Sequence, residues 1–207
     1  MKVNDCVPHP LFTAFPLSPN KKTKMYGKEL TLGDLETVAK KLKWCVPALM
    51  EAYVIGTGAV AAAHEKLPGS LRFSVDFDFV PKNLPILYYD SLMVDRFIGP
   101  ESEFRDETKV YADYATPETV RCTPAGWLER TWVINVTDGL TLYCLSAHDV
   151  AYNKLYAGRP KDIVWVRELL KTEIITWESL NELHAGNPLA TVDREKVERS
   201  MSAVRGQ

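Results

Sequence analysis

The run LRFSVDFDFVP at residues 71–81 constrains the fold most, because large apolar residues alternate in it with polar ones. Successive side chains of a β-strand point to opposite faces, so the pattern predicts a strand with one apolar and one polar face. The apolar face consists of Phe73, Val75, Phe77 and Phe79. We expect this face to enter the core of a globular domain.

The polar face of the same strand carries Arg72, Ser74, Asp76 and Asp78. The two aspartates are two positions apart, which places their side chains about 7 Å from each other along a strand. Like charges at this distance repel unless a cation lies between them, and Mg²⁺ prefers carboxylates together with substrate phosphate oxygens. The strand therefore predicts a magnesium site at Asp76 and Asp78. A solvated strand face without a metal is the alternative interpretation.

A glycine turn, GTG at residues 56–58, precedes this strand by the length of one helix. It follows the short apolar segment YVI and leads into the Ala-rich segment 57–67, which predicts a helix. The free N–H groups and the dipole at a helix N-terminus favour a phosphate group. We therefore expect a phosphate-binding turn at Gly56 and Thr57, beside the two carboxylates.

The same glycines also fit the motif G-x-G-x-x-A of dinucleotide-binding folds, and Asp76 stands twenty positions after Gly56, where such folds place a ribose-binding carboxylate. Two observations oppose this interpretation. Asp78 and further extended residues follow Asp76, and the chain downstream predicts antiparallel strands in place of repeated strand-helix units. An NAD(P)-binding oxidoreductase remains an alternative at this point.

The rest of the chain predicts an α+β fold in which a mixed sheet is flanked by helices and followed by a helical C-terminal part. Residues 84–98 are compatible with either helix or strand. Further strands are expected at residues 109–115, 133–136 and 140–145, where Asp138-Gly139 predicts a hairpin turn. Helices are expected to start at the capping pairs Thr31/Asp34 and Ser146/Asp149, and more helix follows at residues 162–171, 177–183 and 193–204.

This pattern divides the chain into an N-terminal arm at residues 1–27, an α/β core at residues 28–145 and a helical part at residues 146–207 packed on that core. A net charge of −2 over 207 residues gives no general attraction to polyanions, so local groups must bind any nucleotide or RNA. No apolar run reaches the roughly 20 residues of a membrane helix. The N-terminus also lacks a signal peptide pattern, so we expect a cytoplasmic protein that does not bind membranes.

Two motifs, taken in order, resemble the signature of a known superfamily. A glycine turn, a helix and R-x-[ST]-x-D-x-D at residues 72–78 resemble the nucleotidyltransferase superfamily, in the minimal bacterial branch that includes toxin-type nucleotidyltransferases of abortive-infection systems. The sequence at residues 145–170 is similar to the helix pair downstream of the D-x-D in those proteins. The resemblance spans roughly residues 35–172. Thr57 stands where the family usually has Gly or Ser.

The resemblance implies transfer of a nucleoside monophosphate from an NTP to an acceptor hydroxyl of an RNA, a protein or a small molecule. It implies one or two Mg²⁺ ions and, for a toxin, an antitoxin partner. Asp76 and Asp78 would be catalytic metal ligands, and Asp113 is our choice of third carboxylate, with Asp106 and Glu107 as alternatives. A domain of the same fold that binds a nucleotide or a protein without turnover is the main alternative.

The expected nucleotide-binding residues share an ability to contact phosphate. They are Gly56, Thr57, Arg72, Ser74, Lys154 and Arg159. Lys154 can contact a triphosphate as a point charge, and Arg159 can do so as a bidentate fork. Asp162 can also pair with either cation to fasten two helices together, and the two roles are compatible.

Overall fold

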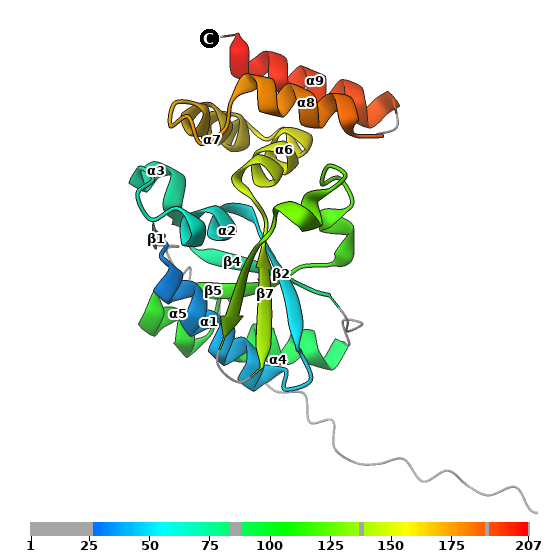
Figure 1. Cartoon of the computed structure of the whole chain (residues 1–207). Coiled ribbons are helices and arrows are strands. Elements are labelled where there is room, and N and C mark those ends of the chain that lie inside the picture. Colours follow the sequence, from blue (N-terminus) through cyan, green and yellow to red (C-terminus); the bar gives the residue numbers. More distant parts are fainter. Residues whose placement is uncertain (1–26, 83–87, 137–138, 189–190, 207) are drawn as a thin grey trace, which may run out of the picture.

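The computed structural model describes residues 27–82, 88–136, 139–188 and 191–206. Almost all of the expected arm at residues 1–27 lies outside this part of the chain, as do Thr137 and Asp138 of the expected hairpin turn. The described residues form a mixed five-stranded sheet with helices packed on it, and a layer of helices at one end (Figure 1). The expected α+β class, with its helical C-terminal part, is confirmed.

The five strands lie in the order β5 (Tyr111–Tyr114), β4 (Asp76–Pro81), β2 (Glu51–Ile55), β7 (Leu140–Cys144) and β6 (Trp132–Val136). β2 is parallel to β7 and antiparallel to β4, while β4 is parallel to β5. β6 and β7 pair antiparallel, which confirms the expected hairpin.

The direction of β4 excludes the dinucleotide-binding interpretation. In that fold the strand before the glycine turn and the strand after its helix run parallel. Here β2 and β4 are antiparallel, with Ile55 directly opposite Asp78. The helix between them, α2 (Gly56–Ala63), is short, and the chain turns back through α3 (Gly69–Arg72) before it enters the sheet in the opposite direction.

The prediction of one long strand over residues 71–81 is partly wrong. Arg72 ends α3, β3 (Phe73–Ser74) pairs with β1 (Lys28–Glu29) in a separate small sheet, and the main strand begins at Asp76. Phe77 and Phe79 are fully buried as expected, but Phe73 is 57% exposed. Alternation in the sequence continues across the point where the chain changes sheets, so the pattern alone does not reveal the break.

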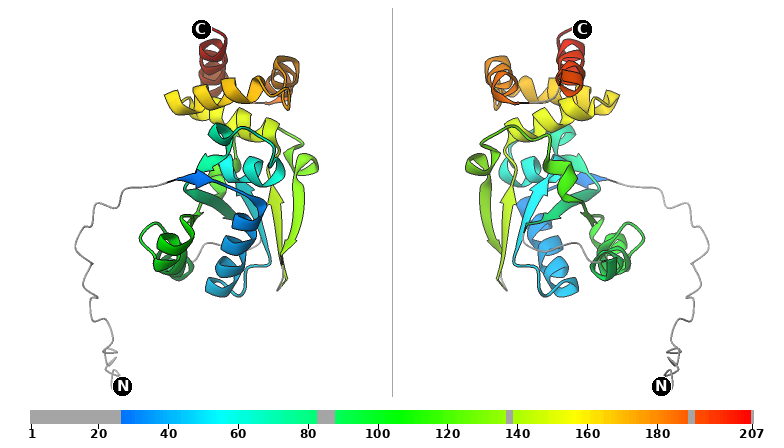
Figure 2. Two further views of the ribbon diagram at one scale, coloured as in Figure 1. Left: turned by 90° about the vertical axis from the view of Figure 1, so that its left-hand side faces the viewer. Right: turned by 90° about the vertical axis from the view of Figure 1, so that its right-hand side faces the viewer.

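Helices α1 (Leu32–Cys45), α4 (Tyr88–Ile98) and α5 (Glu103–Thr108) pack at the side of the sheet that carries the apolar β4 residues (Figure 2). Thr31 and Asp34 form the expected capping box of α1. The segment that was compatible with helix or strand is helical from Tyr88. Because these helices cover one face of the sheet, the polar side chains of β4 point to the other face.

The C-terminal helices are α6 (Ala147–Ala157), α7 (Pro160–Leu170), α8 (Trp177–Gly186) and α9 (Thr191–Arg205). Ser146 caps the start of α6, as expected, and Gly158 ends the helix with a φ of 66°. α6 packs on α2, and the Trp165 indole donates a hydrogen bond to the Leu71 carbonyl at 3.2 Å. These helices therefore cover the end of the sheet at which α2 begins.

The boundary at residues 145 and 146 coincides with the passage from β7 to α6, and one continuous set of buried side chains extends across it. We propose that the α/β core ends at residue 145 and that the helical part begins at residue 146. Between β5 and β6 the chain crosses the molecule in an irregular segment with two short 3₁₀ helices, Pro117–Val120 and Trp127–Arg130. None of the helices described is long and apolar enough to span a bilayer.

Candidate functional site

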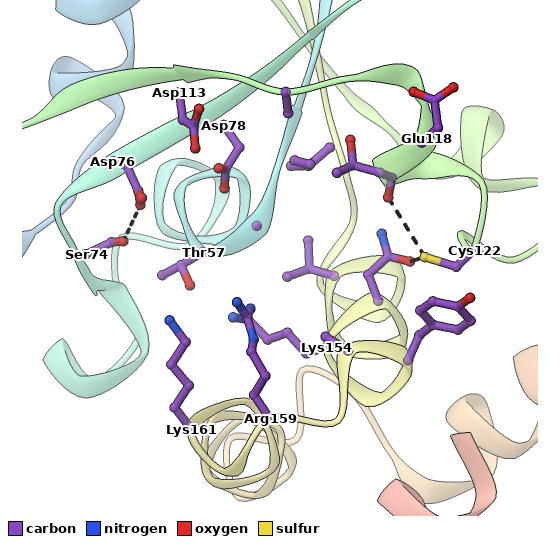
Figure 3. Close-up of a pocket in the computed structure, with 18 of the residues that line it drawn as sticks. Thr57, Ser74, Asp76, Asp78, Asp113, Glu118, Cys122, Lys154, Arg159 and Lys161 are labelled. Carbon is purple, nitrogen blue, oxygen red and sulfur yellow. Dashed lines mark hydrogen bonds between the residues drawn. The ribbon is translucent and has the colours of Figure 1, made fainter. Parts of the chain in front are cut away.

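A cavity of about 600 Å³ lies where the sheet, the start of α2 and the helices α6 and α7 meet (Figure 3). Three aspartates from β4 and β5 form its acidic wall: Asp76, Asp78 and Asp113. Three cations from α6 and the start of α7 face them across the cavity: Lys154, Arg159 and Lys161. Gly56, Thr57 and Ser74 also line this space.

Strand register brings the three carboxylates together. Asp76 and Asp78 occupy alternate positions of β4 and so project from the same face. Asp113 stands beside Asp78 in the parallel pairing of β4 with β5. The two other candidates for the third carboxylate lie on α5, outside this cavity: Asp106 pairs with Arg105, and Glu107 lines a separate cavity. Asp113 stays our prediction for that role.

The carboxylate of Asp76 is oriented by two hydroxyl groups. Its Oδ1 accepts a hydrogen bond from Ser74 Oγ at 2.8 Å, and its Oδ2 accepts one from the Tyr111 hydroxyl at 3.3 Å. Burial and the charge of Asp76 raise the pKa of Tyr111 to about 12, so the phenol remains a hydrogen-bond donor. Sequence reasoning missed Tyr111, because only the register of β5 against β4 places it beside Asp76.

The acidic wall is electrostatically strained. Burial, followed by the charges of Asp76 and Asp113, raises the pKa of Asp78 to about 7, although Lys154 and Arg159 act in the opposite direction. Burial and the charge of Asp76 also raise the pKa of Asp113. A bound cation would relieve this repulsion, and hard oxygen ligands suit Mg²⁺.

The carboxylates do not form a closed metal cage. Within the described residues, no group of three or more His, Cys, Asp or Glu side chains is arranged to hold a metal ion on its own. A divalent cation at Asp76 and Asp78 would therefore need additional oxygen ligands. Mg²⁺ commonly takes these from substrate phosphates and water, so the residues present fit a magnesium ion that binds together with a nucleotide.

Gly56 brings the backbone at the start of α2 against the acidic wall. Its φ is +67°, and a Cβ atom added there would lie 2.5 Å from Asp78 Oδ2. No side chain caps the first turn of α2, so its leading N–H groups are available to a ligand, and Thr57 in this turn lines the cavity. Gly58 differs, because a Cβ there would meet the Phe77 ring, so its smallness serves packing.

Replacement of Gly56 by alanine should weaken nucleotide binding. The positive φ costs about 1 kcal/mol with a side chain present, and the new methyl group forces the Asp78 carboxylate to move. We expect affinity for magnesium with an NTP, measured by calorimetry, to fall about tenfold or more. Gly186→Ala is the matched control, because a Cβ there meets nothing within 4 Å. Equal affinity of the Gly56→Ala protein and the wild type would contradict this assignment.

The basic wall is built around one buried carboxylate. Asp162 is 1% exposed and accepts hydrogen bonds from Lys154 Nζ at 3.3 Å and from the Nε and Nη2 atoms of Arg159. The ammonium group of Lys154 also lies 4.7 Å from the centre of the Trp165 ring. Asp162 thus fastens α6 to α7, as the ion-pair interpretation expected, while both cations still line the cavity. Lys161 is exposed at the cavity edge.

Arg72 does not join the site, which corrects our expectation. Its Nε donates to the Leu67 carbonyl at 3.0 Å, its Nη1 donates to the Leu30 carbonyl at 3.2 Å, and its Nη2 pairs with Glu29. The physical reason is the break in the expected strand. Arg72 is the last residue of α3, so it does not share the strand face of Asp76 and Asp78.

Other cavity residues were not predicted from the sequence. Asn153 and Tyr156 lie on α6 next to Lys154, while Glu118, Thr119 and Cys122 come from the irregular segment between β5 and β6. Lys196 reaches the cavity from α9. Helical periodicity around Lys154 could have indicated Asn153, but no pattern predicts how an irregular segment folds against a helix.

The fold agrees with the comparison with known proteins. The model of a family described as "Nucleotidyltransferase of unknown function (DUF6036)" matches residues 35–204. The chain belongs to this family, whose description implies an enzyme with an NTP as substrate. No curated protein matched the chain, and no solved structure matched it.

Proposed function

We propose that the protein transfers a nucleoside monophosphate from a magnesium-bound NTP to an acceptor hydroxyl. One observation carries the proposal: three carboxylates on β4 and β5 face three cations on α6 and α7 across one cavity, with the uncapped start of α2 between them. A triphosphate with a divalent cation matches both walls, because the metal suits the carboxylates and the phosphate oxygens suit the cations.

The acidic wall, the basic wall and the start of α2 each have a defined task in this proposal. Asp76 and Asp78 hold the metal, and Ser74 and Tyr111 keep the Asp76 carboxylate oriented. The leading N–H groups of α2 at Gly56 and Thr57 bind phosphate oxygens, and Lys154, Arg159 and Lys161 supply positive charge. Bound Mg²⁺ neutralises charge on the phosphate oxygens and lowers the pKa of the acceptor hydroxyl.

The transfer requires one proton acceptor. A bond forms between the acceptor oxygen and the α-phosphorus, the bond from that phosphorus to the bridging oxygen breaks, and pyrophosphate leaves. The hydroxyl proton passes to Asp113, the carboxylate on the neighbouring strand β5 beside Asp78. The remaining catalysis comes from positioning and charge neutralisation.

Thermal melting tests the site directly. Magnesium with the preferred NTP should stabilise the protein by about 3 kcal/mol at a hundredfold excess over Kd, whereas the same NTP with a chelator should give little stabilisation. Incubation with NTPs labelled at the α-phosphate and with cell extract should then label an acceptor. Asp76→Ala should end both responses. The absence of a magnesium-dependent shift with all four NTPs would overturn the proposal.

The same experiment separates the enzyme from a domain that only binds. Thr57 stands where the superfamily that the motif resembles usually has Gly or Ser, and its branched Cβ crowds the turn, which favours this second candidate. A binding module would be stabilised by magnesium and an NTP but would label no acceptor. Separation of labelled RNA, protein and small molecules identifies the acceptor class. We further propose that the protein acts as a toxin with an antitoxin partner, a role that the resemblance of the motifs supports.

A further inference from the structure

One wall of the cavity is unlike the acidic and basic walls. We call it the amide wall, after Asn153, and define it as Thr119, Cys122, Asn153 and Tyr156. Two charged residues, Glu118 and Lys196, line the cavity beside it, and the ammonium group of Lys196 lies 4.5 Å from the centre of the Tyr156 ring. We infer that this wall binds the nucleobase and that Asn153 determines which base is accepted, an inference that rests on the proposed function. Phosphates and metal have their partners elsewhere in the cavity, so this wall is left for the nucleoside.

Helix α6 connects the amide wall to the phosphate-binding cations. Val150, Asn153, Lys154 and Ala157 have the spacing of a single helix face, and all four line the cavity. Lys154 belongs to the phosphate-binding part of the cavity. Asn153, the neighbouring polar residue on the same helix, belongs to the amide wall. The volume of about 600 Å³ lies within the range of roughly 300–1,000 Å³ for cavities that enclose whole small ligands.

Asn153 keeps hydrogen-bonding capacity for a ligand. Its Nδ2 donates to Thr123 Oγ1 at 3.0 Å, and its Oδ1 accepts from the Cys122 thiol, with the sulfur at 3.5 Å. Burial raises the pKa of Cys122, so this group is a neutral thiol and a weak donor. These contacts leave one amide N–H and a lone pair of Oδ1. A donor beside an acceptor is the combination with which asparagine reads the edge of a base.

Arg130 holds in place the segment that contacts the Asn153 side chain. Arg130 donates to the Pro124 carbonyl at 3.2 Å and to the Ala125 carbonyl at 3.1 Å, so it clamps the irregular segment that carries Cys122 and Thr123. The same guanidinium makes two hydrogen bonds to Asp149, which is fully buried on α6. A rigid amide discriminates between bases better than a mobile one, because little ordering cost is paid on binding.

Binding measurements with four NTPs and with inorganic tripolyphosphate, each with magnesium, test the inference. Wild type should bind its best NTP about tenfold or more tightly than its worst, the discrimination expected of one such amide pair. Asn153→Ala should remove this spread and leave tripolyphosphate affinity unchanged. Asn153→Asp, which loses the donor but keeps the shape, should change the order of preference. Asn135→Ala, an exposed asparagine on β6 outside the cavity, is the matched control.

The outcomes separate this inference from the function on which it rests. Failure of tripolyphosphate and all four NTPs to bind would overturn the proposed function and the base site together. Bound tripolyphosphate with four equal NTP affinities in wild type would overturn the base site alone. A loss of tripolyphosphate affinity in Asn153→Ala, with the NTP spread intact, would show that Asn153 only supports the phosphate region and would also overturn the inference.

Discussion

The replacement of Asp78 by asparagine should stabilise the metal-free protein and end its response to magnesium and NTP. Asp78 lies close to two other carboxylates, and its ionised form is unfavourable in the folded state, where its pKa is about 7 against an ordinary value of 3.8. Asparagine has similar shape and no charge. We expect the free energy of unfolding at pH 8 to rise by about 1–2 kcal/mol, a typical trade between stability and function at an active site.

The pH dependence follows from the direction of this shift. Between pH 3.8 and about 7 the folded wild type binds more protons at Asp78 than the unfolded chain does. The contribution of Asp78 to stability is therefore complete below this window and is lost as the pH rises through it. Melting in a chelator from pH 5 to pH 8 should show a steeper loss for wild type than for Asp78→Asn.

Asp106→Asn is the matched control for Asp78→Asn, because Asp106 is an exposed aspartate outside the cavity. Because Asp106 pairs with Arg105 at the surface, we expect its replacement to change the stability by no more than about 1 kcal/mol and to leave the magnesium response as in wild type. If the Asp78→Asn protein is less stable than wild type at pH 8 in chelator, repulsion among the carboxylates does not destabilise the folded state. A retained magnesium-dependent NTP shift would remove Asp78 from the metal site.

The replacement of Asp162 by alanine should strongly destabilise the folded protein. The carboxylate is almost fully buried and accepts hydrogen bonds from two cations, one of which, Lys154, has a side chain only 14% exposed. Burial lowers the pKa of Lys154, and Asp162 opposes that decrease. Removal of the acid leaves Lys154 buried without its partner, so we expect a loss of about 3–5 kcal/mol in the free energy of unfolding, measured in urea.

A matched control lies on the same helix. Glu168 on α7 pairs with Lys171 at the surface, where both side chains are more than a third exposed. Glu168→Ala should cost less than about 1 kcal/mol, because solvent screens an exposed pair. The Asp162→Ala protein should also bind tripolyphosphate more weakly, since Lys154 and Arg159 lose their common anchor. Similar stability losses in the two variants would show that Asp162 does not fasten α6 to α7.

The sequence predicted the parts of the site that depend on local spacing. Asp76 and Asp78 share a strand face because side chains alternate along a strand, and the start of α2 at Gly56 follows from a turn residue before a helical pattern. The capping pair Thr31/Asp34 likewise predicted the start of α1, and Asp138-Gly139 between two expected strands predicted the β6–β7 hairpin. These features depend on residues within one element, so a single sequence suffices to find them.

Arg72 shows where local spacing fails. Its position in the motif placed it on the strand face of the carboxylates, yet the chain changes sheets after Ser74 and Arg72 binds backbone carbonyls elsewhere. The alternating pattern shows neither where α3 ends and extended chain begins nor the strand with which each extended segment pairs. Strand pairing depends on contacts between distant segments.

By itself, the sequence determined the class of the fold, the pair of carboxylates and the turn before α2. Only the tertiary structure decided that β4 is antiparallel to β2, that Tyr111 and Asp113 stand beside the pair, and that Asn153 faces an irregular segment pinned by Arg130. The physical reason is that these contacts join residues far apart in the chain. They are set by the packing of the whole core, which no local pattern of residues records.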